Sequence, residues 1–213
     1  MRPNRRPGSS PRRSGPSPRL CLASSGPSPL ATCAEAFSTA SDRVVAAAAV
    51  LGENQRIEEE PGALSALGGA LANAGRDLVV AAAALDEDAD WPAAADALAG
   101  VAGSLREAAA ASDAEGMDGL DGAAAELEDA SCVTGCIALA AAAGPNLQEA
   151  AAGVNLASIW LGSRSETLDT GCTPAHRAAG ECMSAAALAM KEAARSLHDA
   201  GARLESGELG AGA

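Results

Sequence analysis

Apolar residues recur at helical spacing along one long stretch of the chain. Between Leu64 and Leu85 they advance in alternating steps of three and four residues. This spacing lines up along one face of an α-helix, whereas a half-buried strand needs an apolar residue at every second position. The positions are Leu64, Leu67, Leu71, Ala74, Leu78, Ala81 and Leu85. The segment is therefore expected to form a helix that buries this face against other helices.

The same spacing recurs in the rest of the chain between residues 33 and 206. Alanine, the best helix former, makes up more than a quarter of the sequence, which has one Phe, two Trp and no Tyr. We therefore expect an all-α fold, an antiparallel helical bundle with a four-helix-type core and extra helices. The expected helices cover residues 33–53, 61–86, 92–112, 117–143, 146–161 and 174–206. Their apolar faces include Phe37, Val44 and Leu51; Ala94, Leu98, Val101, Leu105 and Ala108; Leu147, Ala151, Val154, Ser158 and Leu161; and Met183, Met190, Leu197 and Leu204.

Capping residues and prolines support these boundaries. Asp90 stands just before Trp91-Pro92, and Thr173 stands just before Pro174. A capping side chain followed by proline is typical of a helix start, because the first turn leaves backbone N–H groups unpaired. The Gly144-Pro145-Asn146 sequence predicts that one helix stops and another begins.

Trp160, Leu161 and Gly162 resemble the W-x-G turn of the small secreted helical-hairpin family. That family also carries a tyrosine in its export signal, and this chain contains no tyrosine. We therefore assign no family from the sequence. The tryptophan is expected to close a hairpin between two helices.

The N-terminal residues differ in composition from the remainder. Residues 1–30 are rich in Pro, Ser, Gly and Arg and contain no acidic residue, which predicts disorder. We divide the chain into a disordered basic tail (1–32), an alanine-rich bundle (33–206) and a flexible C-terminal tail (207–213). The Arg- and Ser-rich start is also compatible with an organellar transit peptide or a basic interaction arm. No apolar run of a secretory signal follows the arginines, so the expected location is cytoplasmic.

Charge and segment length exclude two classes of function. The net charge is −13 even with the arginines of the tail included, so the bundle is expected to repel nucleic-acid backbones. The most apolar part of the chain, residues 130–163, is interrupted by Gly144 and Pro145. Its first half, residues 131–143, is shorter than the ~20 residues that a membrane-spanning helix needs, and its second half is also short and contains Asn155, so no membrane span is expected.

Six cysteines carry the main chemical hypothesis. Cys132 and Cys136 share one helical face, and Cys172 and His176 repeat that spacing. If the two segments pack together, these four residues supply three sulfurs and one nitrogen, a set that Zn²⁺ accepts tetrahedrally and that also suits copper. Two other interpretations stay open: the cysteines are buried as small hydrophobic residues, or Cys132 or Cys136 forms a disulfide with Cys172 or Cys182.

No catalytic motif emerges from the sequence. It contains no Glu-x-x-His pair, no phosphate-binding glycine loop and no nucleophile elbow, and it has two histidines. The expectation is therefore a non-enzymatic helical scaffold or interaction protein without a cofactor, forming a homo-oligomer or binding a helical partner. The alternative is a bundle that handles zinc or copper through Cys132, Cys136, Cys172 and His176.

Overall fold

The computed structural model describes residues 28–53, 61–86, 90–112, 117–134, 141–171 and 173–207. These residues form six α-helices and, within the described ranges, no strand. The all-α fold expected from the sequence is confirmed. The helices are α1 (Pro29–Gly52), α2 (Pro61–Asp86), α3 (Trp91–Ser112), α4 (Asp118–Thr134), α5 (Ala143–Asp169) and α6 (Pro174–Ser206).

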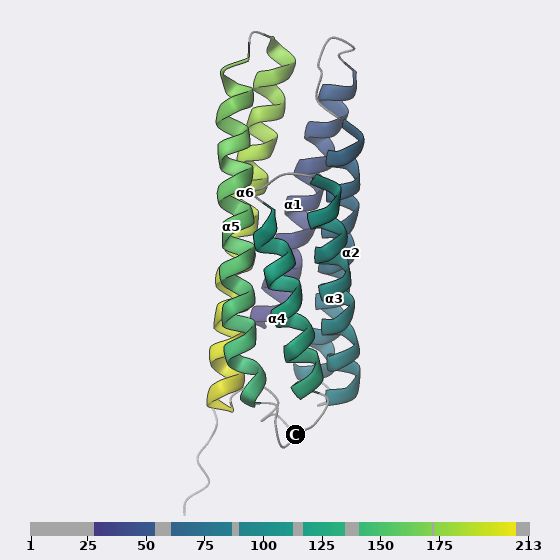
Figure 1. Ribbon diagram of the computed structural model, residues 1–213, viewed down its shortest axis with the longest axis vertical. Helices are drawn as coiled ribbons and strands as arrows, with labels where there is room; N and C mark the ends of the chain where they lie inside the picture. The colour runs from purple at the N-terminus through teal and green to yellow at the C-terminus, as the bar shows by residue number, and fades with distance from the viewer. Residues whose placement is uncertain are drawn as a thin grey trace, which may run out of the picture.

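Each helix packs antiparallel on the next, and α6 returns to pack on α1 (Figure 1). In the view of Figure 1, α5 and α6 lie on one side, α2 and α3 on the other, and α1 and α4 between them. The end of α3 and the start of α4 lie well below the tips of the α1–α2 and α5–α6 hairpins. The two hairpins therefore extend beyond the part of the bundle that α3 and α4 cover.

The apolar faces expected from the sequence form the core. Every residue of the Leu64–Leu85 series is buried, and Phe37 is the largest fully buried side chain within the described ranges. Alanines fill much of the remaining interior, which lets the helices approach closely over their full length. Burial of one face per helix is therefore the main source of stability.

Capping side chains begin two of the helices as expected. The backbone N–H of Ala93 donates to Asp90 Oδ1 at 3.1 Å, which caps α3. The backbone N–H of His176 donates to Thr173 Oγ1 at 3.2 Å, which caps α6. At its other end α6 stops at Gly207, whose φ of 73° is in the left-handed region that glycine adopts without strain.

Several expected boundaries are wrong. Helix α1 begins at Pro29, because proline suits the first position of a helix and Leu30 and Cys33 are fully buried. Helix α4 is described as far as Thr134, residues 135–140 lie outside the described ranges, and Ala143, the expected last residue of this helix, is instead the first residue of α5. Residues 1–27 and 208–213, which make up most of the two expected tails, lie outside them as well.

Helix α5 differs most from the expectation. It begins at Ala143, so Gly144 and Pro145 lie in its first turn, where the missing proline N–H costs no hydrogen bond. It then continues through Gly162 to Asp169, and Trp160 lies inside the helix, partly buried against the core. The turn predicted from Trp160-Leu161-Gly162 is therefore not formed.

Glycines bring several pairs of helices into backbone contact. A methyl group added to Gly119 of α4 would lie 2.6 Å from the carbonyl oxygen of Gly153 of α5. A methyl group added to Gly144 of α5 would likewise lie 2.6 Å from the carbonyl oxygen of Gly201 of α6. Since no larger residue fits at these crossings, glycine sets the distance between the helices.

Buried serines use the same close approach. Ser41 of α1 donates to the carbonyl of Gly68 on α2 at 2.7 Å, and Ser165 of α5 donates to the carbonyl of Gly180 on α6 at 2.9 Å. Each hydroxyl thus finds an acceptor across the helix interface, which offsets the cost of burying it.

Among the helices that the structure describes, none is long and apolar enough to span a membrane.

Candidate functional site

The structure describes two of the four residues of the predicted metal site, Cys132 and His176. Cys132 is exposed on the last turn of α4. His176 lies in the first turn of α6, where its Nδ1 is 2.7 Å from Thr173 Oγ1 beside the helix cap. Cys136 and Cys172 lie outside the described residues, so their contribution to a site stays a prediction.

The bundle does not bring Cys132 and His176 together. Gly153 contacts Gly119 near the start of α4, so the end of α4 lies beside the start of α5. Gly180, near the start of α6, contacts Ser165 near the other end of α5. Cys132 and His176 are therefore separated by about the length of α5, roughly 40 Å for its 27 residues. Within the described ranges, no three His, Cys, Asp or Glu side chains are grouped so that they could hold a metal ion.

None of the three described cysteines forms a disulfide bond; Cys33 is buried, Cys132 is exposed and Cys182 is partly buried. Cys33 is fully buried between α1 and α6, and its thiol donates to the carbonyl of Ala193 at 3.3 Å. Burial raises the pKa of the Cys33 thiol well above its ordinary value, because the thiolate would lose its hydration. Cys33 therefore matches the small-hydrophobic interpretation of the cysteines.

We expect iodoacetamide to label Cys132 in the folded protein well before Cys33. The thiolate is the reacting species, and Cys33 is both inaccessible and held in its neutral form. Timed labelling followed by peptide mass spectrometry measures both rates, and labelling in denaturant provides the control in which the difference disappears. Equal rates in the native protein would contradict the burial of Cys33.

An outward-facing apolar surface on the α5–α6 hairpin is a candidate functional site that sequence reasoning missed. Leu156 is 55% exposed, Ile159 60% and Leu188 68%. Leu188 lies on α6 at about the level of Ile159, because Gly201 faces Gly144 and Gly180 faces Ser165 along the same pair of helices. Leu188 and Ile159 thus lie at one level on the outer side of the hairpin, and Leu156 lies one turn away on α5, where its Cβ also borders Gly119 of α4.

The sequence did hold a signal for this surface. Helix α5 carries its buried face at Leu147, Ala151, Val154, Ser158 and Leu161. It carries a second series with the same spacing at Ala152, Leu156, Ile159 and Ser163, and this series faces outward. A helix that is apolar on two opposite faces has more apolar surface than its own bundle can bury. Three members of the second series lie within the helix expected at residues 146–161, but the sequence does not show which of the two faces the bundle leaves uncovered.

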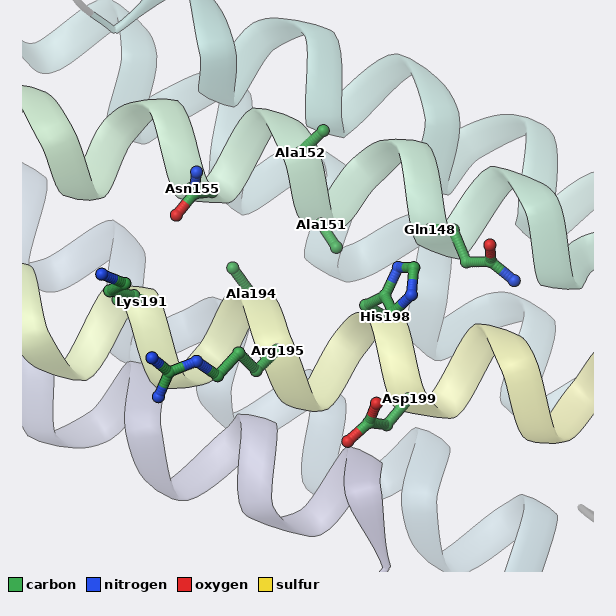
Figure 2. Close-up of a pocket in the computed structure, with 9 residues that line it drawn as sticks. All are labelled: Gln148, Ala151, Ala152, Asn155, Lys191, Ala194, Arg195, His198 and Asp199. Atoms are coloured by element: carbon green, nitrogen blue, oxygen red, sulfur yellow. The ribbon is translucent and has the colours of Figure 1, made fainter.

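A groove of about 390 Å³ lies between α5 and α6 on the outer side of the hairpin (Figure 2). Alanines of α5 and α6 line it together with Gln148 and Asn155 of α5 and with Lys191, Arg195, His198 and Asp199 of α6. In Figure 2, the imidazole of His198 lies between the two helices, and Asp199 lies on the side of α6 away from α5. The ammonium, guanidinium and amide groups can all donate hydrogen bonds to an acidic group of a partner.

The other end of the hairpin has a second groove of opposite character. Its volume is about 330 Å³, and it is lined by Ser165 and Asp169 of α5 and by Gly180, Glu181, Ser184, Ala185 and Leu188 of α6. Asp169 and Glu181 are the charged residues of this lining. The outer side of the hairpin therefore has an apolar middle, one groove with basic residues and one acidic groove.

Acidic residues are concentrated elsewhere, on α4. This helix contains Asp118, Asp121, Glu126, Glu128 and Asp129 and no basic residue. Arg106 of α3 forms an ion pair with Glu128, and this hydrogen bond raises the pKa of the arginine.

Comparisons of the chain with protein-family models, with curated proteins and with solved structures found no match.

Proposed function

We propose that the protein is a non-enzymatic helical scaffold that binds a protein partner through the outer side of the α5–α6 hairpin. The observation that carries the proposal is the exposure of Leu156, Ile159 and Leu188 on this hairpin. Contiguous exposed apolar groups commonly mark protein interfaces, because water contact with them is unfavourable. The flanking grooves add the polar rim that such interfaces have.

The α1–α2 hairpin is a weaker candidate surface. It exposes Val45, Val79 and Val80, which are smaller side chains. Burying an isoleucine or leucine removes more apolar area from water than burying a valine, so the α5–α6 hairpin has more to gain from a partner. The acidic residues of α4 favour a protein over a nucleic acid as that partner, since like charges repel the phosphate backbone.

Photo-crosslinking tests this function. A benzoylphenylalanine placed at Ala152, on the outer side of α5, should form a covalent adduct with a protein in cells that produce the full chain. The same group at Ala83, an exposed alanine on α2, is the matched control and should form none. The Ile159→Asp substitution should remove the adduct formed at Ala152. The proposed function is wrong if no protein adduct forms at Ala152, whatever the partner.

A further inference from the structure

Five exposed residues form a stripe along α6 in the order basic, acidic, leucine, basic, acidic. When this order is reversed, each basic residue falls on an acidic residue and each acidic residue on a basic one. Arg177, Glu181, Leu188, Arg195 and Asp199 are separated by four, seven, seven and four residues, so they lie along one side of the helix. All five are exposed. With Leu188 at the centre, each basic residue on one side of it matches an acidic residue at the same distance on the other side.

We infer that the partner of this surface is a second copy of the chain, bound with its α6 antiparallel and with Leu188 packed on the Leu188 of the other copy. The inference rests on the proposed function and names its partner. A two-fold axis at Leu188 places Arg177 opposite Asp199 and Glu181 opposite Arg195, and symmetry makes each pair twice. A parallel arrangement would instead place Glu181 opposite Glu181 and Arg195 opposite Arg195, which is repulsive.

The two grooves fit the same arrangement. Arg195 and Asp199 line the groove at one end of the hairpin, and Glu181 lines the groove at the other end. In the antiparallel dimer the groove with basic residues of each copy faces the acidic groove of the other. Ile159 lies at the level of Leu188 on α5, so the apolar middles of both hairpins meet at the two-fold axis.

Arg195 can bind across the interface without losing its contact within the chain. Its Nη1 is 3.1 Å from Glu192 Oε2, and the pair is exposed, with 65% and 51% of the two side chains accessible. A guanidinium carries five N–H donors, so further donors remain for Glu181 of the other copy. Exposed ion pairs contribute little to affinity individually, and here they set the direction of the helices while the apolar middle is buried.

Charge reversal of the full chain tests the inference by sedimentation velocity. The wild-type protein should dimerise at micromolar concentration. Glu181→Arg and Arg195→Glu should each raise the dimer dissociation constant at least ~10-fold, because each creates like-charge pairs at the two-fold interface. The double variant E181R/R195E should return to within about 3-fold of wild type, and an equimolar mixture of the two single variants should form a heterodimer.

Controls separate this inference from the proposed function. Leu188→Asp should abolish the dimer, whereas Val80→Asp on α2, also exposed, should leave it unchanged, and circular dichroism should show both variants folded. If the wild-type chain is a monomer at 100 micromolar, or if the single charge reversals leave the dissociation constant unchanged, the inference is wrong. In that case an adduct at Ala152 with a different protein would still support the proposed function.

Discussion

Replacing Phe37 by alanine is expected to lower the free energy of unfolding by about 3–5 kcal/mol. Phe37 is the only phenylalanine of the chain and, among the residues that the structure describes, the largest fully buried side chain. It lies where α1 crosses Gly75 of α2, so removal of its ring leaves a cavity in the interface between these two helices. Urea unfolding followed by circular dichroism measures the change.

The matched control for Phe37 is Leu188→Ala. Leu188 is 68% exposed, so this substitution should change the stability of the monomer by less than about 0.5 kcal/mol. Both measurements belong at low protein concentration, where association does not add to stability. A loss of less than about 1 kcal/mol for Phe37→Ala would show that α1 and α2 do not pack as described.

Replacing Gly153 by alanine is expected to lower the free energy of unfolding by about 2 kcal/mol, although alanine is the better helix former. The added methyl group would overlap the carbonyl oxygen of Gly119 and lie 2.9 Å from Cβ of Ala123. Helices α4 and α5 would have to separate, which would open the contacts along their whole interface. Thermal unfolding with calorimetric detection measures the effect.

Gly122→Ala on α4 is the control for Gly153→Ala, because it makes the same chemical change three residues from the crossing. Nothing lies within 4 Å of the position that its methyl group would occupy, and Gly122 is exposed. This substitution should therefore raise the free energy of unfolding by up to about 1 kcal/mol, the difference in helix propensity. If Gly153→Ala and Gly122→Ala changed the free energy of unfolding in the same direction, the backbone contact between Gly119 and Gly153 would be ruled out.

Local sequence signals correctly predicted the features of the helices that depend on interactions between residues a few positions apart. The caps at Asp90 and Thr173 formed because the side-chain oxygen and the N–H group that it accepts from lie only three residues apart. The buried face of α2 followed from spacing alone, since a helix places residues three and four apart on one side.

Helix continuity in α5 was not predictable in this way. Gly144-Pro145 and Gly162 are helix-breaking signals in isolation, with a cost for each glycine of about 1 kcal/mol. In the bundle, Gly144 gains contact with Gly201, and the buried face of α5 extends as far as Leu168. Packing against α6 therefore outweighs the local preference to stop.

In the candidate site, too, local sequence signals and helix packing must be distinguished. The spacing of Cys132, Cys136, Cys172 and His176 carried no information on which ends of the helices meet. That depends on the order of packing around the bundle, which places Cys132 and His176 at opposite ends of α5. The second apolar series of α5 was visible in the sequence, but its exposure was not, because it depends on how far α4 reaches along α5.

Propensity, capping and periodicity act over a few residues, and they were therefore sufficient to predict that the chain is helical, which residues cap α3 and α6, and which face of α2 is buried. The packing of the helices was needed to identify the glycines in backbone contact, the buried thiol and the apolar series that faces outward. These properties depend on neighbours far apart in the chain, since burial of a face requires another helix of sufficient length to cover it.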